Sequence, residues 1–232
     1  MSDSGYDRRD RNPADTELKF FGAITASVTH ELNNVISIIN QVGGLLEDLS
    51  YGVSQGQEIK PEQMQKITDR ISHQTERGIG IIKRLNTFAH TVDEPVAEFD
   101  ICALMENLVA LSERLATLAG VRLTVQLGDE PVLLTGNRLK IQQVVFLALK
   151  SLLKIAAKDA RLEISVHREE KGASINLDLA MSEMGVTPEV TLLKTIVGQI
   201  EAEMEFAAKP DKTIIKIILP HRAGFADNTA SG

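Results

Sequence analysis

Apolar residues recur at helical spacing through a long stretch near the start of the chain. The steps between them are four, four, three and four residues, which places them on one face of an amphipathic helix. These positions are Ile24, Val28, Leu32, Val35 and Ile39. The pattern predicts a helix from about Thr16 or Glu17 to Leu49, in which Gly43 and Gly44 indicate a bend because glycine weakens a helix interior.

A second stretch with one apolar face follows a turn-rich connection at residues 51–57. Pro61 and Glu62 suit a first helical turn, so we expect a helix from there to about Ala89. Its apolar positions are Met64, Ile67, Ile71, Ile79, Ile82, Leu85 and Phe88. Each of these two helices has one apolar face, which must be buried against another element. The hairpin therefore predicts a homodimeric four-helix bundle, and the alternative is packing on the chain's own C-terminal part.

The pattern changes around Pro95, where we place a domain boundary. Strand-like and helical segments then mix, which predicts an α+β fold in which helices cover a mixed sheet. The expected helices are 101–119, 138–158 and 188–200, and the expected strands are 121–127, 132–134, 162–166, 173–179, 204–206 and 213–219. The predicted organisation is a disordered tail at 1–15, the helical hairpin at 16–93, the second domain at 98–220 and a loose tail at 221–232.

Composition narrows the class of protein. The net charge of −7 and the lack of a dense Lys/Arg cluster argue against nucleic acid as a partner. The longest apolar run, 144–149, is far shorter than the roughly 18 residues of a membrane span, and the N-terminus has no signal-like segment. The single cysteine, Cys102, suits a buried reduced thiol. We therefore expect a cytoplasmic protein that does not insert into membranes.

One cluster of polar residues lies within the first predicted helix, in the run His30-Glu31-Leu32-Asn33-Asn34. His30 is about 200° of rotation from both Val28 and Leu32, which predicts that its imidazole faces solvent, with Ala26 and Ser27 one turn before it. A zinc site of the H-E-x-x-H type is excluded because position 34 is asparagine. A surface histidine with chance neighbours is the other alternative.

This run resembles the phospho-acceptor box of two-component sensor histidine kinases, in its H-E-x-x-N form. The resemblance implies that His30 carries a phosphoryl group on Nε2. It also implies that Glu31 assists as a general base and that Asn34 can orient a water for dephosphorylating a partner.

The second domain resembles the ATP-binding domain of the same family, most clearly at 139–146 and 213–220. Leu147 and Ser151 stand where the family has two asparagines, the second of which helps to hold Mg²⁺. The stretch 180–186 lacks the family's adenine-binding aspartate, and 187–190 has Glu189 but no glycine where phosphates need close backbone approach. These departures imply that ATP binding has been lost.

Three functions are compatible with these observations. The first is a histidine phosphotransferase that relays a phosphoryl group between His30 and aspartates of response-regulator receiver domains. It has no cofactor of its own, because the receiver supplies Mg²⁺. The second is an ATP-dependent sensor kinase with a divergent nucleotide site. The third is a scaffold or response-regulator phosphatase that uses Glu31 and Asn34.

Overall fold

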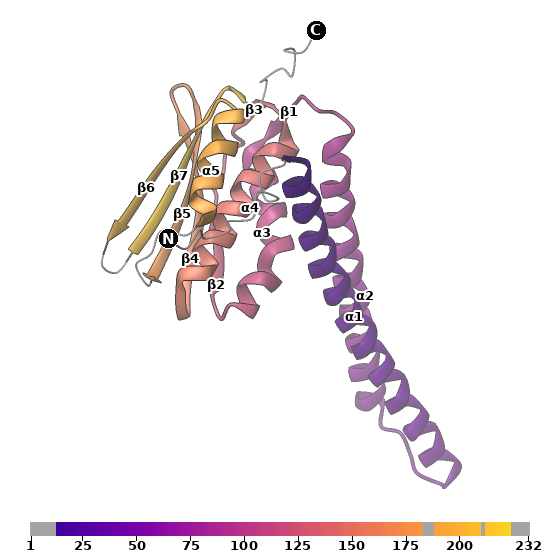
Figure 1. The fold of residues 1–232 in the computed structure, drawn as a ribbon. Coiled ribbons are helices and arrows are strands. Elements are labelled where there is room, and N and C mark those ends of the chain that lie inside the picture. The colour runs from indigo at the N-terminus through magenta and orange to yellow at the C-terminus, as the bar shows by residue number, and fades with distance from the viewer. Residues whose placement is uncertain (1–12, 183–187, 210–211, 224–232) are drawn as a thin grey trace.

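The chain forms a long helical hairpin that leans on an α/β domain (Figure 1). The computed structural model describes residues 13–182, 188–209 and 212–223. The hairpin consists of α1 (Pro13–Ser54) and α2 (Pro61–Ala89). A single turn of 3₁₀ helix, η2 (His90–Val92), follows α2 and leads into the second domain. Among the described residues, no helix combines the length and apolarity that crossing a membrane requires.

The first helix is longer than the sequence pattern predicts. It begins at Pro13, inside the predicted tail, and it continues past Leu49 to Ser54, through residues assigned to the connection. It is continuous across Gly43 and Gly44, where the sequence indicates a bend. At 42 residues it is about 63 Å long. The end was misplaced because a glycine such as Gly52 weakens a helix without necessarily ending it.

The second helix has the predicted bounds, and its start is fixed locally. Pro61 occupies the first helical position, where its missing N–H costs nothing. Gln63 Oε1 accepts a hydrogen bond of 3.1 Å from the Lys60 backbone N–H, which closes a capping box.

In its described residues, the second domain contains three helices and two sheets. The helices are α3 (Ile101–Leu118), α4 (Arg138–Ile155) and α5 (Pro188–Gln199). One sheet has the order β2-β4-β5-β7-β6 and is antiparallel except between β2 and β4; its strands are β2 (Arg122–Gln126), β4 (Ala156–Glu169), β5 (Gly172–Ser182), β6 (Glu203–Lys209) and β7 (Lys212–Pro220). The three helices lie on one side of this sheet (Figure 1), so the predicted α+β sandwich is confirmed.

A small second sheet was not predicted. It joins β1 (Ala97–Asp100), β3 (Leu133–Gly136) and β8 (Arg222–Ala223) in the order β1-β3-β8. Residues assigned to the loose C-terminal tail therefore form a strand. A side chain at Gly136 would collide with the carbonyl oxygen of Ala223, so the close pairing of β3 with β8 requires glycine there.

Asparagine and aspartate fix the starts of two helices. The Asp100 carboxylate accepts hydrogen bonds of 3.0 Å from the backbone N–H groups of Cys102 and Val132. It therefore caps α3 and ties it to the strand region. Asn137 caps α4 by accepting from Lys140 N–H at 3.0 Å. The α4 helix ends at Ile155, three residues before the predicted Lys158, because β4 begins there.

The chain's own second domain covers the part of the hairpin's apolar face that contains Ile24, Val28 and Val35. Ile24, Val28 and Val35 are buried in one core cluster with residues of α3, α4 and the sheet. Four phenylalanines join the two domains, with Phe20 centred 5.3 Å from Phe88 of α2 and 4.9 Å from Phe146 of α4, and with Phe21 5.0 Å from Phe88. The argument that the Ile24/Val28 face needs a second copy to cover it is therefore wrong.

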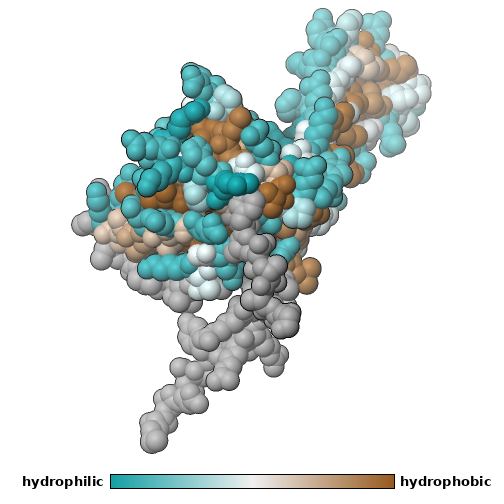
Figure 2. Space-filling model, turned by 90° about the horizontal axis from the view of Figure 1, so that it is seen from above, coloured by the Kyte–Doolittle hydropathy of each residue, from teal (hydrophilic) through white to brown (hydrophobic). Residues whose placement is uncertain are grey.

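Other apolar side chains of the hairpin remain exposed. Figure 2 shows hydrophobic residues in a band along the hairpin arm. The large ones that are exposed are Leu18, Ile36, Leu45, Tyr51, Val53, Met64, Ile79 and Ile82. Leu18 and Ile36 are separated by five full helical turns, and so are Met64 and Ile82, so each pair lies on one face of its helix.

Candidate functional site

His30 is exposed on α1, as its rotation from Val28 and Leu32 predicts. Asn34, one turn later, places its amide nitrogen 3.4 Å from His30 Nδ1. The amide therefore lies at Nδ1, while Nε2 is left for an incoming group. The atom that faces Nδ1 is the amide nitrogen, a donor, which pairs with the tautomer that carries its proton on Nε2. Attack on phosphorus by Nε2 needs the other tautomer, in which the proton is on Nδ1 and the lone pair on Nε2.

The surface before His30 is a shallow groove on α1. Small side chains at Gly22, Thr25 and Ala26 lower the surface between bulkier neighbours, so another molecule can approach the helix closely. A side chain at Gly22 would meet nothing within 4 Å, so the helix itself does not require glycine there. The groove is lined by Leu18, Phe21, Gly22, Thr25, Ala26, Thr29, His30 and Asn33.

Ser27 does not share the exposed face of His30, contrary to the prediction. It is buried, and its hydroxyl donates a hydrogen bond of 3.2 Å to the backbone oxygen of Leu111 in α3. The prediction failed because a serine has no hydrophobicity to mark a buried helix position. The polar contact ties α1 to the second domain, three residues before His30.

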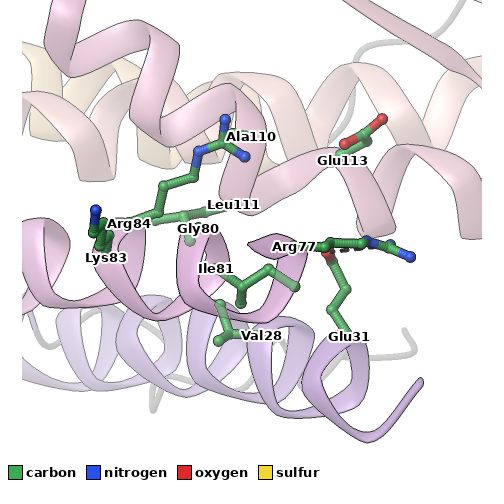
Figure 3. Close-up of a pocket in the computed structure, with 10 residues that line it drawn as sticks. All are labelled: Val28, Glu31, Arg77, Gly80, Ile81, Lys83, Arg84, Ala110, Leu111 and Glu113. Carbon is green, nitrogen blue, oxygen red and sulfur yellow. Dashed lines mark ion pairs between the residues drawn. The ribbon is translucent and has the colours of Figure 1, made fainter. Parts of the chain in front are cut away.

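Glu31, about 100° of helical rotation from His30, lines a cleft between α1, α2 and α3 (Figure 3). Its carboxylate lies 3.9 Å from the Arg77 guanidinium of α2. Burial raises the pKa of Glu31 above its ordinary value, and the nearby Arg77 offsets part of that rise. The structure thus brings His30 and Asn34 together and places the third predicted site residue on a different face.

The cleft contains charged residues that the sequence analysis did not single out. Arg77 and Arg84 of α2 both face α3, on either side of Gly80, and Lys83 lies next to Arg84 (Figure 3). The available signal was the spacing Arg77, Gly80, Arg84, which puts all three on one helical face.

The positions where the resemblance expects metal ligands are buried inside the second domain. Leu147 is 8% exposed and Ser151 is 2% exposed, so both belong to the interior of α4. The Ser151 hydroxyl has no hydrogen-bond partner among the described residues. A hydrated Mg²⁺ keeps several waters and needs an open, oxygen-rich site, so these residues do not fit it.

The nucleotide-binding stretches are only partly described. The segment 183–187, which holds the centre of the expected adenine and phosphate loops, lies outside the described residues. Ala180 belongs to β5, and Pro188 begins α5. Within the described parts of the chain, no group of three or more His, Cys, Asp or Glu side chains could hold a metal ion.

Comparisons with known proteins give structural likeness alone. No protein-family model matches the sequence, and no curated protein matches it. The chain is similar to the catalytic domain of the histidine kinase ThkA, with a TM-score of 0.50 and 10% identity over 56% of this chain and 99% of that one. It is also similar to the histidine kinase AdeS of Acinetobacter baumannii, with a TM-score of 0.48 and 14% identity over 83% of this chain and 98% of that one.

A further neighbour is the histidine kinase ThkA in complex with the response regulator protein TrrA, with a TM-score of 0.47 and 17% identity over 94% of this chain and 65% of that one. Of these three likenesses, that to the ThkA catalytic domain supports an argument, and the argument concerns the fold. The chain contains the fold of a histidine kinase catalytic domain. The family resemblance predicted from the sequence is confirmed at that level.

Proposed function

We propose that this protein is a histidine phosphotransferase of two-component signalling, which exchanges a phosphoryl group between His30 and aspartates of response-regulator receiver domains. The observation that carries the proposal is the exposed His30 imidazole, whose Nδ1 lies 3.4 Å from the Asn34 amide nitrogen and which borders a groove on α1. The kinase-like fold of the second domain supports the assignment to two-component signalling.

The reaction needs little chemistry from the protein itself. The Nε2 lone pair attacks the phosphorus of a receiver aspartyl phosphate, the P–N bond forms, and the P–O bond breaks with its electrons returning to the aspartate carboxylate. In this tautomer, with its lone pair on Nε2, the proton on Nδ1 stays on the ring during the attack. Positioning of the ring therefore supplies the catalysis on this side, and Mg²⁺ belongs to the receiver.

A general-base role for Glu31 requires its side chain to change direction. Its carboxylate faces Arg77 rather than His30, so it would have to turn out of the cleft to take part. We therefore assign the primary positioning role to Asn34. The same exposed amide is placed to orient a water for dephosphorylating a bound receiver, as the family resemblance implies.

Transfer without ATP is supported by the closed interior of α4. Leu147 cannot coordinate a cation, and the buried Ser151 hydroxyl is not open to one. These two residues therefore provide no ligand for the Mg²⁺ ion that binds together with ATP. We infer that the second domain contributes packing and a docking surface rather than nucleotide chemistry.

The active form is proposed to be a homodimer with a four-helix bundle. Ile36 of α1 and Ile82 of α2 are 54% and 47% exposed, respectively, and are among the exposed apolar side chains of the hairpin. These side chains are separate from the Ile24/Val28 face, which the second domain already covers. A second copy that packs on Ile36 and Ile82 can leave His30 accessible, because His30 is about 120° of rotation from Ile36.

The proposal is tested by transfer from a receiver domain carrying phosphate on its aspartate. Wild-type protein should gain acid-labile, base-stable phosphate, and His30→Gln should gain none while keeping its fold, because the ring faces solvent. His90→Gln is the matched control, since His90 is also exposed and on the hairpin side, bonded to Asp93 at 2.6 Å. Transfer to the His30→Gln protein contradicts the assignment.

A further inference from the structure

The cleft beside Glu31 has no part in the transfer chemistry proposed above. It is a cavity of about 470 Å³, within the range of small-molecule sites. It is bounded by α1 and α2 on one side and by α3 on the other (Figure 3). Its lining comprises Val28, Glu31, Arg77, Gly80, Ile81, Lys83, Arg84, Ala110, Leu111 and Glu113.

The two ends of the cavity differ in charge, as Figure 3 shows. Lys83 and Arg84 make one end cationic, whereas Glu31 and Glu113 lie at the other end beside Arg77. Arg77 and Arg84 are two helical turns apart, so the ends are separated by about 10 Å.

The middle of the cavity is apolar. Val28, Ile81 and Leu111 line it from three helices, and Ala110 adds a small side chain. Such a lining favours a ligand with an apolar body between two polar ends, because burying apolar surface is favourable where the charged groups are not involved.

The cationic end has no counter-charge in direct contact among the described residues, and Arg84 acts on Glu31 only at longer range. In the described parts of the chain, the Lys83 and Arg84 side chains make no ion pair or hydrogen bond, and Arg84 is tied to α3 through its backbone oxygen, which accepts from Asn107 at 3.3 Å. Two adjacent unpaired cations repel each other. A phosphate, which accepts several hydrogen bonds from arginine and lysine at once, removes that repulsion.

Gly80 keeps the cavity open between the two arginines. A Cβ atom there would meet nothing within 4 Å, so packing does not demand glycine. Glycine in a helix interior costs about 1 kcal/mol of stability relative to alanine. At Gly80 the missing side chain leaves room between Arg77 and Arg84.

We propose that this cavity binds a small phosphate ester that carries an ammonium group at its other end, with an apolar body between them. The phosphate lies against Lys83 and Arg84, and the ammonium group lies between Glu31 and Glu113. The proposal does not depend on phosphotransfer by His30, because its residues and its readout are separate.

The test uses calorimetry on the full chain with tyramine phosphate as the probe. Tyramine phosphate has the two charges and an aromatic body, while inorganic phosphate and tyramine each supply one end. We expect tyramine phosphate to bind at least about tenfold more tightly than either fragment, because both ends and the apolar middle contribute.

Two variants locate the binding. Arg84→Gln should weaken it about tenfold or more, as loss of a charge-assisted contact does. Gly80→Leu fills the cavity without changing charge and should abolish it. Lys66→Gln, an exposed α2 residue away from the cavity, is the matched control for charge and should leave binding unchanged.

The proposal is overturned if tyramine phosphate does not bind at millimolar concentrations. It is equally overturned if binding survives Gly80→Leu and Arg84→Gln, or if Lys66→Gln weakens it as much as Arg84→Gln does, since binding would then reflect general surface charge.

Discussion

At the scale of single residues, rotation around one helix separates groups that are adjacent in sequence. His30 faces solvent and meets Asn34 one turn later, whereas Glu31 turns about 100° away to Arg77. The His30 imidazole and the Asn34 amide therefore lie together in the single chain. The Glu31 carboxylate lies in a separate cleft, beside Arg77.

The environment of Glu31 gives the protein a testable pH dependence. Because burial raises its pKa in the folded state, the protonated form is favoured by folding. Stability from this group is full below its unfolded value of about 4.5 and is lost as pH rises through the folded value. Glu31→Gln should therefore be more stable than wild type near neutral pH and equal to it in acid.

Chemical denaturation at several pH values measures this difference. Glu58→Gln, in the exposed connection between α1 and α2, is the control and should show no such crossover. If Glu31→Gln is the less stable protein at neutral pH, attraction to Arg77 outweighs burial.

At the scale of elements, the contact between the hairpin and the second domain depends on aromatic packing. Phe20 of α1 is 1% exposed and meets both Phe88 and Phe146. Phe20→Ala should lower the free energy of unfolding by about 3–5 kcal/mol, because it leaves a cavity where three helices meet.

Denaturant unfolding followed by far-UV circular dichroism checks this value. Leu118→Ala is the control, since Leu118 is exposed and should change stability little. A loss below about 1 kcal/mol for Phe20→Ala shows that the domain contact adds little to stability.

Much of the element order could be predicted from the sequence, because apolar spacing and local caps determine it. Pro61 at the start of α2 and Asp100 at the start of α3 are local signals, and both starts are where the pattern places them. The small sheet could not be predicted, because β8 is two residues long and exists through pairing with β3, far away in sequence.

The candidate site was predictable in part for the same reason. The exposure of His30 and its contact with Asn34 follow from helical periodicity alone. The burial of Ser27 and the direction of Glu31 depend on α3, whose position against α1 is a tertiary fact. Sequence periodicity identifies a buried face but not which element buries it.

At the scale of the whole molecule, the exposed apolar side chains of the hairpin predict that two chains associate. We predict that the full chain is a dimer and that Ile36→Glu combined with Ile82→Glu makes it a monomer, because charges in an apolar contact are costly to bury. Light scattering measures the mass directly.

The matched control for the dimer prediction lies on the second domain. Leu133 is 52% exposed there, and Leu133→Glu should leave the protein dimeric. A monomeric wild-type protein, or a dimer that persists in the double variant, removes the hairpin band from the account.

The source of the phosphoryl group tests the central claim most directly. The protein is incubated with labelled ATP and Mg²⁺ in one arm and with a labelled phospho-receiver in the other, and the label on His30 is measured with His30→Gln as the blank. We predict label from the receiver and none from ATP, because Leu147 and Ser151 are closed inside α4. Label on His30 from ATP contradicts the account and makes the protein a kinase.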